Sequence, residues 1–497
     1  MPLLLGIDVG TSFVKGVLAT PEGRVVAQAS AGYATNHPRP GWAEQDPHDW
    51  WRGVVAVTHL VLAAAERGLG APAAVAGIGV SGQGCAVTLI GAKGEALHPA
   101  IIWMDSRSEP QCERLRQEYA SEILHINGKS PAPYNADPVL IWLQQHAPEL
   151  IDATYCSLTT TGYVNFRLTG RPVTNASDAS ILFAYDLAHG GWSSQLLAAF
   201  GLPPRLYPEV RPCREVIGGL TAAAAAELGL PAGIPVIAGG EDTSSAGLAL
   251  GAVRPGMAFL SLGTAGTLYA TEPRPRVHPQ LLTFAHVLEQ QFLVGGSMGA
   301  IGAALAWLRT ALGTEEELGT LLDLAASANP GADNLIFLPY LNGDLQPIND
   351  GYARGVFFGL GMQTGKAELV RSVLEGAAYA IAQNLEYAEL LSGHIQEIRA
   401  TGGPTRSALW CQIIADVCNR PLSVLADEGG APLGNALLAG SAVGLIEDIA
   451  ATAAQAAEVR TRYLPDAARH ERYGRLFAIY KQLYPNLKDL YVELARV

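Results

Sequence analysis

Two short segments carry residue types that could grip a chain of phosphates. Residues 3–16 (LLLGIDVGTSFVKG) and 258–269 (AFLSLGTAGTLY) each read as an apolar strand, a Gly-Thr turn and a returning strand, and they lie half a chain apart. A turn of Gly and Thr leaves backbone N–H groups and a hydroxyl uncovered, so it can approach a polyanion without a side-chain clash. Two such turns that face each other would hold a nucleotide between two related halves.

The first turn also offers a carboxylate. Asp8 ends the predicted strand, where it could hold Mg²⁺ or its water ligands against nucleotide oxygens. Thr11 and Lys15 could reach the same oxygens. The alternative is a hairpin whose Asp supports the turn. These residues alone favour neither interpretation.

A second carboxylate follows another predicted strand. The segment 238–247 (AGGEDTSSAG) places Asp242 between glycines and a helix of small residues. Phosphoryl transfer to an alcohol needs an acceptor that orients the hydroxyl and takes its proton, and Asp242 fits that role. The alternative is a plain helix N-cap.

Two further glycine-rich segments need an interpretation. Residues 401–407 (TGGPTRS) open a predicted helix and could pack against adenine and ribose, or form a simple loop. Residues 77–82 (GIGVSG) fit the GxGxxG pattern of dinucleotide-binding folds, with Asp105 at about the expected distance downstream. That pattern requires a helix after the glycines, whereas residues 85–90 predict a strand. The sequence therefore argues against dinucleotide binding, and it contains no Walker A loop.

The elements that must position these groups follow the apolar periodicity and the turn residues. Residues 3–31 predict a three-stranded antiparallel meander, and residues 46–67 predict a helix with Asp46 as its N-cap and Pro47 at its first position. Further strands are predicted at 74–80, 85–90, 257–262, 267–270 and 292–295, and further helices at 109–120, 138–145, 300–312, 366–391 and 407–419. A chain of 497 residues is too long for one core, so we expect an α/β protein of two domains, 1–252 and 253–497.

Composition excludes several classes of function. The net charge of −13 is spread without a long basic run, which argues against nucleic acid or an anionic membrane surface as a partner. No apolar stretch reaches the length of a membrane span, and the N-terminus enters a strand directly. The six cysteines are scattered, without metal spacing. We therefore expect a cytoplasmic protein with reduced thiols and a small-molecule ligand.

Several motifs are typical of one family. Residues 355–360 (GVFFGL) are followed by 368–375 (ELVRSVLE), and residues 41–47 (GWAEQDP) by Trp50-Trp51. With the blocks at 167–170, 174–180, 338–341 and 434–438, they make the chain resemble the FGGY carbohydrate kinases over essentially its whole length, in particular the xylulokinase-like members. The resemblance implies two RNase H-like domains of the actin, Hsp70 and hexokinase superfamily, each with a mixed sheet, closing a cleft over ATP and a sugar.

The resemblance also implies roles for individual residues. Asp242 matches the catalytic base and Asp8 the acid near Mg²⁺, with the sugar held mainly by the first domain. The positions that match nucleotide-binding residues are Thr11 in the first turn, Gly263 and Thr264 in the second, and Gly302, Gly403 and Ser407 around ATP. The positions that fall in segments bordering the sugar are Gln83, Gly84, Trp103 and Asp105.

Three departures concern the substrate more than the chemistry. Residues 81–86 read SGQGCA where xylulokinases typically have SGQMHG, so Gly84 and Cys85 replace a Met and a His that border the ketose. Residues 343–345 (GDL) replace a usual Gly-Glu-Arg, and Val139 replaces a usual Lys. The sequence therefore leaves the identity of the sugar open.

We predict an enzyme that transfers the γ-phosphoryl group of ATP, with Mg²⁺, to a terminal hydroxyl of a small sugar, with a pentulose such as xylulose as the best candidate. The first alternative is a kinase for a polyol of the erythritol or glycerol type. A non-catalytic nucleotide-binding module and a dinucleotide oxidoreductase are the rivals from other classes. The resemblance also allows a homodimer, because many relatives form dimers.

Overall fold

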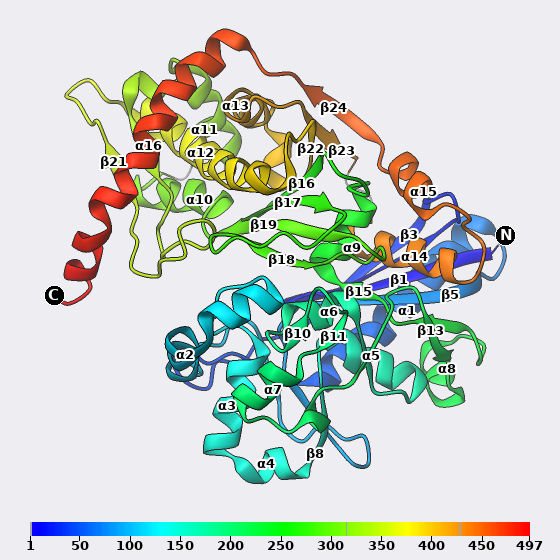
Figure 1. The fold of residues 1–497 in the computed structure, drawn as a ribbon. Helices are drawn as coiled ribbons and strands as arrows, with labels where there is room; N and C mark the ends of the chain where they lie inside the picture. The colour runs from blue at the N-terminus through cyan, green and yellow to red at the C-terminus, as the bar shows by residue number, and fades with distance from the viewer. Residues whose placement is uncertain (1, 315, 427–428) are drawn as a thin grey trace.

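Two domains, each built on a seven-stranded mixed sheet, make up the molecule (Figure 1). The structure is a computed structural model that describes residues 2–314, 316–426 and 429–497. The first sheet has the order β13 (Val216–Gly219), β14 (Pro235–Ile237), β5 (Ala74–Gly82), β1 (Pro2–Val9), β2 (Phe13–Ala19) and β3 (Val25–Gly32), with β15 (Gly240–Glu241) also paired to β5. The second has the order β18 (Leu282–Ala285), β19 (Phe292–Met298), β17 (Gly266–Glu272), β16 (Met257–Leu262), β22 (Glu397–Gly402), β23 (Leu422–Leu425) and β24 (Val459–Tyr463).

The two predicted hairpins are confirmed, and they occupy equivalent places in the two sheets. β1 pairs antiparallel with β2 and parallel with β5. In the same way β16 pairs antiparallel with β17 and parallel with β22. Each Gly-Thr turn therefore follows a strand that is central to its sheet, and each turn lies at the edge where the parallel neighbour also ends.

Helices cover both sheets. The first domain carries α1 (Pro47–Leu69), α5 (Thr160–Thr169), α6 (Ala176–Ile181), α8 (Ala222–Leu228) and α9 (Asp242–Ala249), with a group of helices at one end formed by α2 (Glu109–Asn127), α3 (Ala136–His146), α4 (Pro148–Ala153) and α7 (Ser194–Phe200). The second carries α10 (Gly302–Ala311), α11 (Leu318–Ser327), α12 (Lys366–Ser392), α13 (Ala408–Cys418) and α16 (Ala467–Leu494), while α15 (Ile449–Ala456) lies against α9. No helix of the described residues is long and apolar enough to cross a bilayer.

Local capping chemistry sets two of these boundaries, and the cap predicted at Asp46 is confirmed. α1 starts after Asp46, whose side chain accepts from the His48 N–H, and α13 starts after Ser407, whose hydroxyl accepts from the Trp410 N–H. The predicted strand 85–90 is displaced, because β6 spans Thr88–Gly91 and Cys85 takes the left-handed conformation with φ 59°. No helix follows residues 77–82, so this part of the chain lacks the helix that dinucleotide binding requires.

Among the described residues, two helices from the second half of the chain pack against the first domain, and one of them is α15, which contacts α9. α14 (Gly430–Ala442) lies on β1, β5 and α9, as Figure 1 shows. A Cβ at Gly6 would overlap the carbonyl oxygen of Pro432, and one at Gly434 would overlap that of Ser245. Only glycine permits so close an approach. The boundary predicted between residues 252 and 253 lies between α9 and β16 and stays a prediction.

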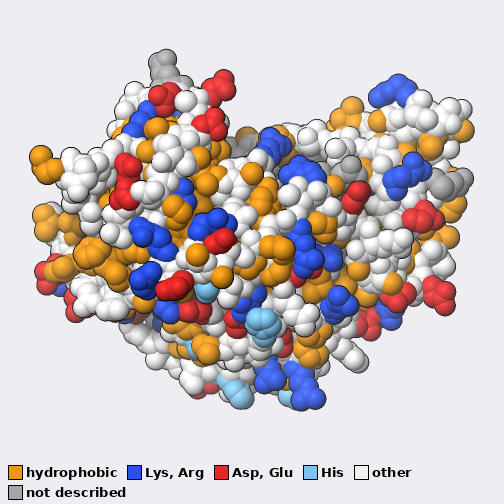
Figure 2. All heavy atoms as spheres, turned by 90° about the horizontal axis from the view of Figure 1, so that it is seen from above, with side chains coloured by type: hydrophobic (Ala, Val, Ile, Leu, Met, Phe, Trp, Pro, Cys, Tyr) orange, Lys and Arg blue, Asp and Glu red, His pale blue; other side chains and the backbone are white. Residues whose placement is uncertain are grey.

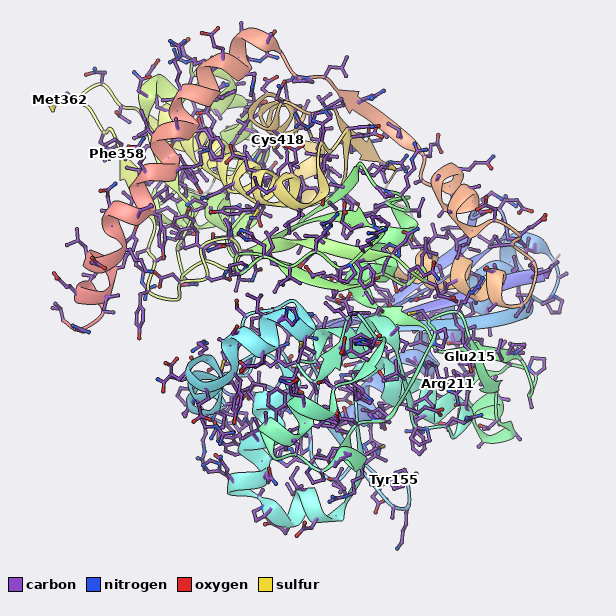
Figure 3. The ribbon with its side chains drawn as sticks, in the orientation of Figure 1. Tyr155, Arg211, Glu215, Phe358, Met362 and Cys418 are labelled. Carbon is purple, nitrogen blue, oxygen red and sulfur yellow. The ribbon has the colours of Figure 1, made fainter. Side chains whose placement is uncertain are left out.

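The surface carries charges of both signs. On the face shown in Figure 2, Lys and Arg side chains are interspersed with Asp and Glu. The family motif at residues 355–360 contributes β21 (Val356–Phe358), and Phe358 and Met362 lie exposed at the periphery of the second domain (Figure 3). This motif, which carries part of the resemblance, therefore lies away from the interdomain pocket described below.

The approach of α14 to β1 predicts a large effect of one methyl group. We expect Gly6→Ala to lower the free energy of unfolding by about 1–3 kcal/mol, because the new Cβ meets backbone that cannot move aside easily. The matched control is Gly68→Ala on the exposed last turn of α1, where a Cβ meets nothing within 4 Å. That change should stabilise by about 0.5–1 kcal/mol, since glycine is unfavourable in a helix. Urea-unfolding midpoints of the two variants check both signs, and equal midpoints would contradict the constraint.

Candidate functional site

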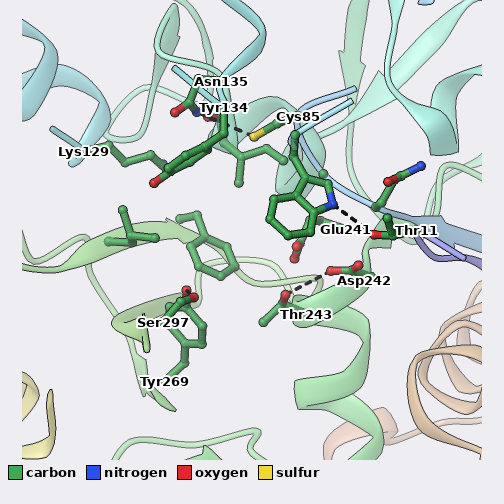
Figure 4. A pocket seen from close by; sticks show the side chains of 16 residues that line it. Thr11, Cys85, Lys129, Tyr134, Asn135, Glu241, Asp242, Thr243, Tyr269 and Ser297 are labelled. Carbon is green, nitrogen blue, oxygen red and sulfur yellow. Dashed lines mark hydrogen bonds between the residues drawn. The ribbon is translucent and has the colours of Figure 1, made fainter. Parts of the chain in front are cut away.

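A cavity of about 270 Å³ lies between the two domains and draws its walls from both (Figure 4). Its lining from the first domain is Thr11, Gln83, Gly84, Cys85, Trp103, Lys129, Tyr134, Asn135, Ile181, Glu241, Asp242 and Thr243. Its lining from the second is Tyr269, Leu282, Phe284 and Ser297. Five of the residues predicted from the sequence therefore meet in one place: Thr11, Gln83, Gly84, Trp103 and Asp242.

Asp242 is the first residue of α9, and it is free of the capping role. The N-cap is Glu241, whose carboxylate accepts from the Ser244 N–H at 2.9 Å. Asp242 accepts from the Thr243 hydroxyl at 3.0 Å and remains partly exposed at the cavity. Burial, and then the neighbouring charge of Glu241, raise the pKa of Asp242 well above its usual range. The plain N-cap interpretation therefore fails for this residue.

Asp8 lies at the end of β1, beside the first turn. The Ser81 hydroxyl of β5 donates to one carboxylate oxygen of Asp8 at 2.7 Å. Burial and the charge of Asp242 raise the pKa of Asp8 to about 7, while Lys15, its cross-strand partner on β2, lowers it. The two predicted carboxylates are thus close enough to interact electrostatically, and the exposed Lys15 supplies the nearby positive charge.

The predicted sugar-facing residues divide into two groups. The Trp103 indole N–H donates to the Thr11 hydroxyl at 2.9 Å, and Gly84 leaves room for Ile181, whose Cδ1 would lie 2.5 Å from a Cβ at that position. Asp105, in contrast, does not line the cavity. Its carboxylate accepts from the Ala43 N–H at 2.6 Å and pairs with the Arg107 guanidinium at 2.8 Å.

The residues predicted to surround ATP gather at the same end of β16 and β22. The Gly302 N–H donates to Gly263 O at 3.0 Å, and the Ala303 N–H donates to Thr264 O at 3.0 Å, so the first turn of α10 lies on the second Gly-Thr turn. The parallel pairing of β16 with β22 sets Leu262 opposite Gly402, next to Gly403. Ser407 caps α13 after the same turn. Their contact with ATP stays a prediction.

The structure adds residues that sequence reasoning missed. Lys129, Tyr134 and Asn135 come from the irregular segment between α2 and α3. The Lys129 ammonium donates to Ser180 O at 2.6 Å and to Thr283 O of the second domain at 2.8 Å. Tyr269 and Ser297 lie on paired strands. No motif in the neighbouring sequence marks these positions as part of a site. Glu241 also lines the cavity, and it lies in the segment 238–247 that was singled out for Asp242.

Comparison with known proteins supports the family resemblance seen in the sequence motifs. The model of the FGGY family of carbohydrate kinases, N-terminal domain, matches residues 3–249, and that of its C-terminal domain matches residues 258–443. A xylulose kinase of Escherichia coli (strain K12) is 32% identical over 98% of this chain and 100% of its own length. A glycerol kinase of Thermococcus onnurineus (strain NA1) is 31% identical over 88% of this chain and 89% of its own.

A solved structure extends the similarity to three dimensions. The crystal structure of xylulose kinase from Rhodospirillum rubrum superimposes with a TM-score of 0.92 at 32% identity, covering 98% of this chain and 99% of that one. The two-domain architecture predicted from the sequence is therefore confirmed.

A buried acid behind the site predicts a pH-dependent stability. Burial raises the pKa of Asp178, on α6, to about 7 from its usual 3.8, and the charge of Asp242 adds to the effect. The folded state therefore holds this proton more tightly than the unfolded state, so the carboxylate costs stability that grows as pH rises from about 4 to about 7. We expect Asp178→Asn to be more favourable relative to the wild type at pH 8 than at pH 4, by up to a few kcal/mol.

Urea unfolding of both proteins across this pH range measures the difference. The control is Asp323→Asn on an exposed position of α11, which should leave the pH dependence unchanged. Parallel curves for the wild type and Asp178→Asn would contradict the prediction.

Proposed function

Because the chain belongs to the FGGY family of carbohydrate kinases, we propose that it transfers the γ-phosphoryl group of ATP to a terminal hydroxyl of a small neutral sugar, with xylulose as the best candidate. The observation that supports it most is the position of Asp242. This residue starts α9 without capping it, and its carboxylate lines a cavity formed by both domains. The similarity to a glycerol kinase favours a polyol as the second candidate.

In this proposal Asp242 orients the sugar hydroxyl and takes its proton. The hydroxyl oxygen bonds to the γ-phosphorus, the bond from phosphorus to the bridging oxygen breaks, and ADP leaves with that oxygen. Thr11 of the first turn and Lys15 on β2, with Gly263 and Thr264 of the second turn, hold the phosphates. Because both domains line the cavity, their closure on the sugar would exclude water and limit ATP hydrolysis.

The residues at the end of β1 suit a magnesium ion bound with the nucleotide. Mg²⁺ keeps several waters and is commonly held by one or two carboxylates together with phosphate oxygens. Asp8 supplies such a carboxylate next to the first turn, and its raised pKa reflects a buried negative charge that a cation would relieve. When bound, the ion would neutralise phosphate charge. The described residues form no cluster of three or more metal-ligating acids, thiols or imidazoles. The homodimer that the family resemblance allows also stays a prediction.

The charges of the cavity favour a neutral substrate. Glu241 and Asp242 present carboxylates, which accept hydrogen bonds from hydroxyl groups. Lys129 is the one cation among the described lining residues, and its ammonium group is directed at backbone carbonyls of both domains. A sugar acid would place its carboxylate near two others without a free cation to pair with. Neutral ketoses and polyols avoid that cost.

Removing the proton acceptor tests the mechanism. We expect Asp242→Asn to lower kcat by about 10²- to 10⁴-fold while sugar and ATP still bind, because the amide keeps the shape of the carboxyl and cannot take the proton. A coupled ADP-release assay and calorimetric binding of each substrate separate the two effects. Asp323→Asn serves as the matched control and should retain full activity. An Asp242→Asn enzyme with normal kcat would show that another group is the base.

A substrate panel tests the charge preference. We expect kcat/KM for D-gluconate to lie at least about 100-fold below that of the best neutral substrate among D-xylulose, D-ribulose, erythritol and glycerol, because opposing like charges costs several kcal/mol. ADP release without any sugar sets the background. Efficient turnover of D-gluconate would contradict the proposed role of the cavity charges.

A further inference from the structure

Thr11, in the first Gly-Thr turn, is held from two sides by residues of the sugar-facing part of the molecule. Its hydroxyl accepts from the Trp103 indole N–H at 2.9 Å, the bond that is dashed to Thr11 in Figure 4. Its backbone oxygen accepts from the Gln45 side-chain amide at 2.8 Å. A residue of the proposed phosphate turn is therefore positioned by Trp103, which lines the cavity, and by Gln45, which contacts the cavity-lining Gln83.

The hydrogen bonds of the Gln45 side-chain amide fix its orientation, so its nitrogen and oxygen cannot exchange places. Gln45 is fully buried, and its nitrogen donates to Thr11 O and to the Thr35 hydroxyl at 2.7 Å. Its oxygen accepts from the Trp50 indole at 2.9 Å and from the Gln83 amide at 2.7 Å. An indole N–H can only donate, so the oxygen must face Trp50 and the nitrogen must face Thr11.

That orientation also fixes Gln83, which lines the cavity. Since the Gln83 nitrogen donates to Gln45, its carbonyl oxygen is the atom left over, and this oxygen is buried without a hydrogen-bond partner in the described protein. A buried polar atom without a partner is costly, and a substrate hydroxyl is a donor that would satisfy it. A hydrogen-bonded path then runs from the cavity through Gln83 and Gln45 to the first turn.

Gln45 and Trp103, the two residues that hydrogen-bond to Thr11, both lie at one pair of short strands. β4 (Glu44–Gln45) pairs antiparallel with β7 (Ala100–Ile101), with Gln45 opposite Ala100, and Trp103 follows two residues after β7. Trp103 is 43% exposed and lines the cavity, so a bound sugar would contact its ring. A shift of this pair of short strands would move both hydrogen bonds to Thr11 together.

We propose that Gln45 and Trp103 are positioning residues that couple occupancy of the sugar pocket to the grip of the first turn on the nucleotide phosphates. The inference rests on the proposed function. A sugar that donates to Gln83 and packs on Trp103 fixes both groups that hold Thr11, and so prepares the turn for phosphate. Linkage makes the effect reciprocal, so the nucleotide strengthens sugar binding by the same factor.

The test measures that factor directly. Calorimetry gives the Kd of a non-hydrolysable ATP analogue with Mg²⁺, in the absence and in the presence of saturating D-xylulose, and the ratio of the two values is the coupling. For the wild type we expect a ratio between about 5 and 150, the usual range for coupled sites. We expect Trp103→Phe, which keeps the aromatic wall and deletes the N–H, to reduce the ratio about two- to tenfold, as the loss of one hydrogen bond predicts. Gln45→Met should reduce it similarly.

The matched control is Trp192→Phe, which deletes an indole N–H donated to Pro208 O at 2.7 Å outside the cavity lining. It should leave the ratio unchanged, and thermal unfolding confirms that each variant folds. Because Trp103 is partly exposed, Trp103→Phe decides the question even if Gln45→Met does not fold. A merely structural role would change both Kd values and leave their ratio unaltered.

Three outcomes overturn the proposal. The sugar used for the ratio is D-xylulose where it binds, and otherwise the substrate of the panel with the highest kcat/KM. With that sugar bound, a ratio of one in the wild type, or an unaltered ratio in Trp103→Phe, overturns the coupling alone. A wild-type protein that binds neither the analogue nor D-xylulose overturns the proposed function, and the coupling with it.

Discussion

The contact of α14 with β1, β5 and α9 is the constraint on which the site depends. Backbone meets backbone there, because Gly6 and Gly434 carry no Cβ to hold the segments apart. The Asn435 amide of α14 donates to Ile7 O, one residue before Asp8, and its oxygen accepts from the Ser245 hydroxyl, three residues after Asp242. One side chain thus ties the strand that ends in one carboxylate to the helix that begins with the other.

The same arrangement concentrates negative charge where the proposed nucleotide, ATP, is itself an anion. Burial raises the pKa of Asp8, Asp178, Glu241 and Asp242. Removing carboxylates from water is unfavourable, so this cluster lowers the stability of the domain that holds it. A site of this kind favours a ligand that arrives with its own cation, since the cation relieves the acids and the phosphates together. Stability given up for function is common at active sites.

What the sequence could predict was local. The hairpins followed from apolar strands around a Gly-Thr turn, and the start of α1 followed from Asp46 as its cap. The lining of the cavity was not local, since Lys129 reaches Ser180 and Thr283 through the folding of distant segments. The strand predicted at 85–90 was displaced because Cys85 turns the chain with a positive φ, which apolar periodicity does not register.

Asp105 shows how a sequence motif can mark a site without touching it. Its carboxylate, with that of Glu44, encloses the Arg107 guanidinium, which also lies 3.6 Å from the centre of the Trp42 ring. A buried charge cluster of this kind is costly to break, because removal of one member leaves the others unpaired. It therefore fixes the loop after β7, and with it the backbone from which Trp103 reaches Thr11. Asp105 lies two residues after Trp103, which lines the cavity, and it supports the position of Trp103 by making this loop rigid.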